Sequence, residues 1–284
     1  MSRLVINADD FGLTSGVNRA ILELHHANVL TSATLMASAV ATDEAITSAL
    51  ATPSLGVGCH IVLVDGEPVL PPRDLPTLVD PATGRFQPTL GAFLWRLVTG
   101  QIRAGEIEAE AEAQFQLLRS RGLTLTHADT HKHTHMFPAV LRPVARAARA
   151  AGVPAIRNPF EPAWSIRRTP GAPSLRRAQV LLLRRLRPAF HRIVAQYGLA
   201  TTQGALGVLA TGTLDTATLR SLLARVPSGT FELVTHPGYN DADLARVRTR
   251  LLASRETERT ALAALCEFPQ MELVSFAALH RSPT

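Results

Sequence analysis

The sequence contains a single lysine, Lys132, only two cysteines, and no apolar run of the roughly 18 residues that a membrane-spanning helix requires. The two cysteines, Cys59 and Cys266, provide no disulfide framework, so a reducing cytoplasm is the expected compartment. The N-terminal stretch MSRLVINADD has the pattern of a strand that carries charge, not of a signal peptide. Because 46% of the 284 residues are hydrophobic, the chain has ample material for a buried core.

Acidic residues are absent between Glu161 and Asp215, where the chain carries eight arginines. The whole chain has a net charge of +6, so the remaining residues together carry about −2 (6 − 8) and the basicity is local. A local positive surface indicates an anionic partner. No aromatic interleaving and no recognised nucleic-acid module accompany these arginines, so nucleic acid is not the expected partner.

Residues 164–199 are interpreted as a basic helical insertion in a single domain that spans residues 1–284. Pro188 should kink or divide any helix in this segment. Two interpretations stay open. The segment is either a core helix with a solvated basic face, or an element on a bilayer surface, with its apolar side chains in lipid and its arginines on anionic headgroups.

Seven apolar runs of strand length alternate with helical patterns, and residues 272–275 form a weaker eighth run. Repeated strand–helix units indicate a parallel sheet, and about seven of them indicate a barrel. We therefore expect an α/β fold, a distorted (β/α) barrel of about seven parallel strands. The expected strands are residues 3–8, 31–36, 55–64, 124–130, 155–158, 201–208 and 231–235.

Helices are expected between these strands, and Gly122 and Gly152 should end the second and the third of them. Residues 64–90 are rich in Pro, Gly and Asp and are interpreted as a long functional loop, of the kind that often forms a lid. The expected helices are residues 17–27, 106–121, 139–151, 216–224 and 241–265.

The stretch HADTHKHTHMFP places one aspartate and four histidines at every second position. Alternate residues of a strand share a face, so five polar groups are expected on one side. Such a set would be costly to bury without partners, which favours a functional site over a structural one. The five residues are His127, Asp129, His131, His133 and His135.

Aspartate or histidine stands at the end of four of the expected strands, and the carboxyl ends of parallel strands converge on one site. Asp9 and Asp10 can both face this site only if their strand ends there, and Phe11-Gly12 supplies the break. The alternative for the pair is a helix N-cap, for which Ser15 is better placed. A carboxylate with two imidazoles is a common ligand set for a catalytic divalent metal. Cys59, beside His60, is expected to be a small buried hydrophobe.

Four motifs in chain order resemble the YdjC-like carbohydrate deacetylases: NADDFG, a Gly-x-His that closes the third strand, DTHKHTHMFP and THPG. The resemblance implies that Asp10, His60 and His131 are metal ligands and that Asp9 is the catalytic base. Magnesium is the usual metal that it implies, while the donor set itself would also accept Zn, Mn or Co. The segment from RNPFEPAW to TTQGALGVLATGTLD further resembles the hopanoid-biosynthesis (HpnK-type) branch.

The resemblance implies hydrolysis of an N-acetylated amino sugar, with the N-acetylglucosaminyl head group of a hopanoid glycolipid as the expected substrate. An amine leaves poorly unless it is protonated, and His236 is the candidate general acid. His133, His135 and Arg157 are expected to bind substrate. The protein is expected in the cytoplasm, with peripheral contact to the inner face of the cytoplasmic membrane and a homodimer as open alternatives.

Two other functions compete with this interpretation. A metal-dependent phosphoesterase also uses Asp and His at a barrel rim, but it usually needs two metals and more carboxylate ligands than are visible here. A non-catalytic protein could use the arginine-rich segment to bind a membrane or RNA. Measuring acetate release against phosphate release separates the two enzymes.

Overall fold

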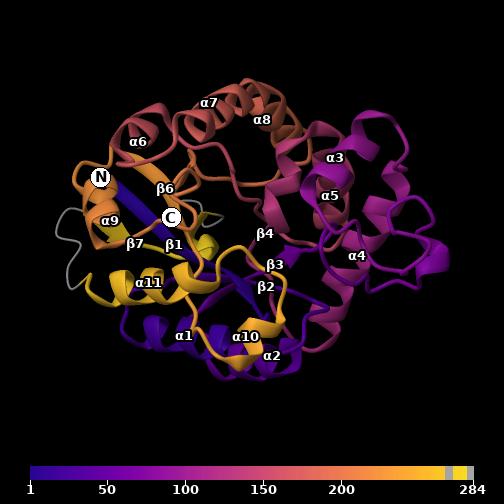
Figure 1. The fold of residues 1–284 in the computed structure, drawn as a ribbon, viewed down its shortest axis with the longest axis horizontal. Coiled ribbons are helices and arrows are strands. Elements are labelled where there is room, and N and C mark those ends of the chain that lie inside the picture. The colour runs from indigo at the N-terminus through magenta and orange to yellow at the C-terminus, as the bar shows by residue number, and fades with distance from the viewer. Residues whose placement is uncertain (266–270, 280–284) are drawn as a thin grey trace.

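A computed structural model describes residues 1–265 and 271–279, and Cys266 therefore lies outside the described residues (Figure 1). Parallel strands form one curled sheet in the order β4-β3-β2-β1-β6-β5, with β7 also paired to β1. This half-barrel with surrounding helices confirms the expected distorted α/β barrel. The strands are β1 (Ser2–Phe11), β2 (Ser32–Leu35), β3 (Gly56–Ile61), β4 (Ala128–Thr130), β5 (Ala205–Leu206), β6 (Gly229–Thr235) and β7 (Met271–Leu273).

The prediction of a strand at residues 155–158 is wrong, although the segment lies next to β4, where that strand would be. It forms only isolated parallel bridges, from Ile156 to Ala128 and from Ala155 to Ala200. Pro154 and Pro159 flank the segment, and a proline has no N–H with which to continue a ladder. The sheet therefore continues past β4 through single bridges, which makes the barrel irregular on this side.

The helices cover the sheet on all the sides seen in Figure 1, and α6, α7 and α8 lie together along one side. Gly122 and Gly152 have positive φ angles of 94° and 68° directly beyond α4 and α5, as expected for helix ends. The helices are α1 (Ser15–His26), α2 (Thr42–Ala51), α3 (Leu90–Val98), α4 (Ala104–Ser120), α5 (Pro138–Ala150), α6 (Ala163–Arg168), α7 (Ser174–Leu183), α8 (Arg187–Gln196), α9 (Thr216–Leu223), α10 (Ala242–Arg246) and α11 (Leu252–Ala263).

Two helix expectations need correction. Thr14, not Ser15, caps α1, because the Thr14 hydroxyl accepts a hydrogen bond from the Val17 N–H. The single helix expected over residues 241–265 is divided into α10 and α11. Between them the Thr249 hydroxyl accepts from the Leu251 N–H, a local bond that competes with helix continuation.

The long segment 64–90 is anchored to α4 by four backbone hydrogen bonds. Glu106 and Glu110 of α4 are buried and accept hydrogen bonds from its backbone at 2.8–3.0 Å, through the N–H groups of Thr77 and Leu78 and of Val69 and Leu70. Buried backbone donors need such partners, and a carboxylate is a strong acceptor. The acidic face of α4 therefore fixes this segment.

Pro188 divides the basic insertion, as expected. It occupies the first turn of α8, and a short 3-10 turn, η3 (Arg184–Leu186), separates α8 from α7. No helix among the described residues is long and apolar enough to cross a bilayer.

Candidate metal centre

Two adjacent aspartates reach the same site because β1 is irregular where they occur. The β1–β2 register shifts between Ala8 and Phe11, and Asp10 has a left-handed φ of 64°. Consecutive strand residues normally point to opposite faces, and this local turn redirects the Asp10 side chain. Asp9 and Asp10 are both 2% exposed. The expected break lies at Asp10 itself, one residue before Phe11-Gly12.

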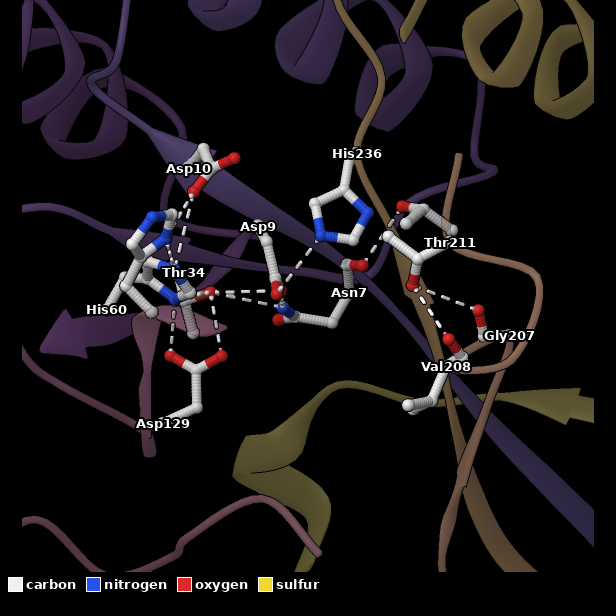
Figure 2. Close-up of polar contacts among 12 residues, drawn as sticks. Asn7, Asp9, Asp10, Thr34, His60, Asp129, Gly207, Val208, Thr211 and His236 are labelled. Carbon is white, nitrogen blue, oxygen red and sulfur yellow. Dashed lines mark hydrogen bonds and ion pairs between the residues drawn. The ribbon is translucent and has the colours of Figure 1, made fainter. Parts of the chain in front are cut away.

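Three candidate ligand atoms converge at the carboxyl edge of the sheet. Asp10 Oδ1 lies 3.3 Å from His60 Nε2 and 3.4 Å from His131 Nδ1. The two imidazole nitrogens are 3.2 Å apart, and the three ligand atoms lie within 4.8 Å of one another. Figure 2 shows Asp10 above the ring of His60, with Asp129 on the opposite side of that ring. The three residues come from β1, β3 and the turn after β4.

This cluster fits a divalent metal ion. Asp10 Oδ1 is buried and has no hydrogen-bond donor among the described residues, so an acceptor oxygen is available. His60 Nδ1 is engaged by Asp129 Oδ1 at 2.7 Å, which orients the ring and leaves Nε2 toward Asp10. A carboxylate behind a histidine in this way is typical of metal ligands. The donor set of two nitrogens and one carboxylate suits Zn, Mn or Co.

The second carboxylate oxygen of Asp10 is held by Arg255, which the sequence analysis did not identify. Arg255 lies on α11, is 1% exposed, and donates from Nη2 to Asp10 Oδ2 at 2.5 Å. Burial would raise the pKa of Asp10, but the charge of Arg255 together with the neighbouring His131 and His60 outweighs it and holds this pKa well below its usual range. Arg255, Glu258 and Leu262 are buried on one face of α11. In the sequence, the only sign of this role is that Arg255 and Glu258 stand three positions apart and so lie on the same face of the expected helix.

Asp9 is bound by a different arginine. Arg157 donates to both of its oxygens, from Nη1 to Oδ2 at 2.8 Å and from Nη2 to Oδ1 at 2.6 Å, and Asn7 Nδ2 donates to Oδ1 at 3.0 Å. Burial would raise the pKa of Asp9, but the Arg157 guanidinium lowers it below its usual range. Arg157 has no exposed surface and also pairs with Asp129 and Glu232. One guanidinium thus joins three buried carboxylates.

His236 completes the site from the end of β6. Its Nε2 is 3.7 Å from Asp9 Oδ2, and Figure 2 shows its ring on the side of Asp9 away from His60. Its backbone N–H donates to Glu258 Oε2 at 2.7 Å, and its Nδ1 lies 3.8 Å from the same oxygen. Burial lowers the pKa of His236, but the Glu258 carboxylate outweighs it and raises this pKa.

The expected row of five polar groups on one strand face is wrong. β4 ends at Thr130, and residues His131–Met136 form a tight turn, η2, in which Lys132 and His133 have left-handed φ angles of 57° and 53°. Strand alternation requires extended backbone, and these residues do not have it. The histidines therefore diverge after His131.

The remaining histidines of the run have separate surroundings. His127 stacks on Phe276 at 3.8 Å and bonds to Asn7 Oδ1 at 3.1 Å, below the site. His135 has no exposed surface and contacts Thr130 Oγ1 at 2.8 Å. His133 is partly exposed at the site, and burial together with the Arg157 charge lowers its pKa to about 3, so it is neutral.

Cys59 is buried on β3, as expected for a small hydrophobe, and burial raises the pKa of its thiol well above the usual value. A thiol with that pKa is not a ready nucleophile at neutral pH. The chemistry of the rim therefore rests on its aspartates and histidines.

The fold and the cluster together define the class of this protein: an α/β barrel with a candidate metal centre of one aspartate and two histidines at the carboxyl edge of its sheet. Within this class, the chain belongs to the YdjC-like protein family, which matches residues 3–267. A crystal structure from Enterococcus faecalis, of a candidate cellobiose-phosphate cleavage protein, shares the fold with a TM-score of 0.77 and 24% identity over 98% of each chain.

Three curated relatives are similar in sequence. The carbohydrate deacetylase of Thermoanaerobacter pseudethanolicus is 30% identical over 92% of this chain and 91% of its own length. The carbohydrate deacetylase of Brevibacillus brevis is 40% identical, but the match covers 56% of this chain and 60% of that protein. The chitooligosaccharide deacetylase of Salmonella paratyphi B is 36% identical over 53% of this chain and 57% of its own length. The chain thus spans about three fifths of the last two relatives.

Proposed function

We propose that this protein is a metal-dependent carbohydrate deacetylase, which hydrolyses the N-acetyl group of an amino sugar to acetate and a free amine. The observation that carries the proposal is the buried, unbonded Asp10 Oδ1, which lies 3.3 Å and 3.4 Å from the nitrogens of His60 and His131. The family and the names of the relatives support the reaction and the class of substrate.

Asp10, His60 and His131 would hold the metal. When bound, a divalent ion there supplies Lewis-acid polarisation of the acetyl carbonyl and lowers the pKa of water. By family resemblance we propose magnesium, and the nitrogen donors leave Zn, Mn and Co as alternatives. Metal analysis of protein purified without chelator decides between them.

Asp9 and His236 would divide the proton transfers. Asp9 accepts a proton from the water whose oxygen attacks the acetyl carbon, and His236 donates a proton to the amide nitrogen as the C–N bond breaks. Arg157 keeps Asp9 ionised at neutral pH, and Glu258 favours the protonated form of His236. Their separation of 3.7 Å allows both groups to act on one tetrahedral centre.

We propose that His133 contacts the substrate, since it is partly exposed and neutral. His135 and Arg157 were expected to bind substrate as well. Both are fully buried, and His135 Nε2 lies 3.2 Å from the Arg157 carbonyl oxygen. A role in holding the rim together suits their positions better than a direct contact with sugar.

A two-metal phosphoesterase has less support. Asp9, His60 and Asp129 form a second cluster of ligand atoms within 4.8 Å, where another ion could be imagined. Arg157 already binds both aspartates of this cluster. Both oxygens of Asp9 accept hydrogen bonds from Arg157, whereas Asp10 Oδ1 has no donor among the described residues, so a single metal ion at Asp10 has more support than two ions.

The test is an acetate-release assay on N-acetylglucosamine oligosaccharides, with phosphate release from sugar phosphates measured in parallel. The wild-type protein should release acetate only. Asp9→Asn should keep the metal and lose turnover by a factor of about 10² or more, as expected for a general base. Phosphate release without acetate release would reject the proposal. Loss of metal in Asp9→Asn would reverse the roles of the two aspartates.

We further propose that the sugar is the N-acetylglucosaminyl head group of a hopanoid glycolipid, reached by peripheral contact from the cytoplasmic side. The supporting observation is that α7 turns apolar side chains outward. Leu175, Leu181 and Leu182 are 73%, 45% and 58% exposed. Arg176 and Arg177 of the same helix turn inward and donate to backbone carbonyls. An exposed apolar helix followed by a run of arginines, here Arg184, Arg185 and Arg187, is the pattern of a monotopic element.

A further inference from the structure

Helix α11 sends two buried, oppositely charged side chains to the rim of the barrel. Arg255 donates to Asp10 Oδ2 at 2.5 Å, and Glu258 accepts from the His236 N–H at 2.7 Å. Each is 1% exposed. One helix therefore contacts both a candidate metal ligand on β1 and the candidate general acid after β6.

Arg255 and Glu258 are three residues apart, a spacing at which opposite charges on a helix usually pair with each other. Within the described part of the chain they form no such pair, and each binds a residue of the site instead. Both side chains also have buried atoms that form no hydrogen bond among the described residues, namely Arg255 Nε and Nη1 and Glu258 Oε1. Burying charged groups that are only partly satisfied is costly, so their burial against residues of the site indicates a role beyond packing.

The backbone after β6 is docked on the same helix. The Gly238 N–H donates to the Arg255 carbonyl oxygen at 3.2 Å. A Cβ at Gly238 would lie 3.1 Å from Arg255 Cδ, so the close approach favours glycine here. The Tyr239 ring lies between the guanidinium groups of Arg19 and Arg259, at 3.8 Å and 4.3 Å from its centroid. The loop that carries His236 is thereby fixed relative to α11.

We propose that α11 is a two-point positioning element, in which Arg255 orients the metal ligand Asp10 and Glu258 orients the general acid His236. Arg255 holds one oxygen of Asp10 and so leaves the other toward His60 and His131. Glu258 accepts a hydrogen bond from the His236 backbone N–H, and its carboxylate lies 3.8 Å from Nδ1 of the His236 ring. The inference rests on the proposed function and adds to it that one helix sets the spacing between metal site and acid.

The experiment separates the two contacts with charge-neutralising variants of nearly equal size. Arg255→Gln should weaken the affinity for Zn²⁺ or Mn²⁺ by roughly 10- to 100-fold, the usual effect of losing a partner of a metal ligand. This is measured by calorimetric titration of chelator-treated protein. Glu258→Gln should leave this affinity within about twofold and lower kcat for acetate release by about tenfold or more, with KM little changed. The solvent-facing Glu256→Gln is the matched control and should change neither quantity.

A double variant tests whether Glu258 acts through His236. Glu258→Gln combined with His236→Gln should be no slower than His236→Gln alone, because residues that act as one unit are not additive. Additive losses, or equal losses of metal affinity in the Arg255 and Glu258 variants, would overturn the inference. If Arg255→Gln does not fold, Arg255→Lys keeps a positive charge and should retain more metal affinity than Arg255→Met.

The proposal for α11 and the deacetylase proposal can fail independently of each other. If the wild-type protein releases no acetate, the deacetylase proposal fails. The metal titrations and crystal structures of the two variants still decide on α11. Arg255→Gln should then show a rotated Asp10 carboxylate, and Glu258→Gln a displaced His236 ring, and unchanged positions of both would reject the positioning role.

Discussion

Arginine has opposite surroundings in two regions of this protein. Between Glu161 and Asp215 the chain carries eight arginines without one acidic residue; the two in α7, Arg176 and Arg177, donate to backbone carbonyls, and Arg185 beyond it is exposed. At the carboxyl edge of the sheet Arg157 and Arg255 are both fully enclosed, and both bind carboxylates of the candidate site. The segment with eight arginines is the more conspicuous one in the sequence, but the two buried arginines hold the carboxylates of the candidate site.

The difference shows that the number of charges in a segment says little about their effect. A surface guanidinium is solvated and screened by salt, so its contribution is small. A buried guanidinium between carboxylates interacts in a low dielectric and cannot be removed without leaving uncompensated charge. The comparison therefore predicts large effects for single substitutions at the rim and small ones in the insertion.

The largest effect is expected for Arg157→Met. It removes the cation that pairs with Asp9, Asp129 and Glu232, and breaking a buried ion pair in this way costs about 3–5 kcal/mol of unfolding free energy. Without Arg157, burial raises the pKa of Asp9 and Glu232, so the loss should shrink as the pH falls and these two groups become protonated. Urea unfolding at pH 7 and pH 5 measures both effects. A loss below about 1 kcal/mol at pH 7 would contradict the comparison.

The second-largest effect is expected for the three candidate metal ligands. Replacing Asp10, His60 or His131 by alanine should abolish both metal retention and acetate release, because a site with two protein ligands is poor. His133→Ala should keep the metal, since its ring lies outside the cluster of ligand atoms. Elemental analysis of the purified variants checks this. Full occupancy in His131→Ala would move the ligand role to His133 or His135.

The convergence of Asp9, Asp10, His60, His131 and His236 could be predicted from the sequence, because each lies at or just beyond the carboxyl end of a strand in a parallel sheet. The end of the histidine alternation could not, since it depends on left-handed backbone at Lys132 and His133. Arg255 and Asp10 are 245 residues apart in the sequence, and only the packing of α11 against the sheet brings them together. Likewise, the glutamates of α4 look like a solvated face until segment 64–90 is seen to cover them.

A smaller effect is expected on the pH dependence of kcat/KM in Glu258→Gln. His236 is faced by Glu258 from α11, Asp9 and Asp10 from β1, and His133 from η2, and the Glu258 carboxylate raises its pKa above 6.5. A general acid works while protonated, so activity is present below this pKa and is lost as the pH rises through it. Removing the carboxylate lowers the pKa, and the alkaline limb should move to lower pH. Glu256→Gln should leave the limb in place, and an unmoved limb in Glu258→Gln would argue against His236 as the acid.

The smallest effect on the folded protein is expected in the insertion. Arg185 is exposed, whereas Arg184 and Arg187 are half-buried and Arg187 Nε donates to His191 Nε2 at 3.2 Å. Replacing the three by glutamine should change the unfolding free energy by about 0.5 kcal/mol or less, because none of them pairs with a carboxylate in the described part of the chain. Arg176→Gln is the contrast, because it removes the half-buried guanidinium that donates to the carbonyls of Thr211 and Val208 and should cost about 1 kcal/mol.

For membrane binding, the triple variant should show the larger effect and Arg176→Gln the smaller one. Each arginine near an anionic bilayer contributes up to about 1 kcal/mol, so the triple variant should bind anionic liposomes far more weakly, whereas Arg176→Gln should bind almost normally. Raising the salt concentration should weaken wild-type binding in the same way. Turnover of a lipid-embedded substrate should then fall in the triple variant while turnover of a small N-acetyl sugar stays unchanged. Equal losses on both substrates would assign these arginines to the fold, and the difference between the two arginine regions would then lie only in their burial.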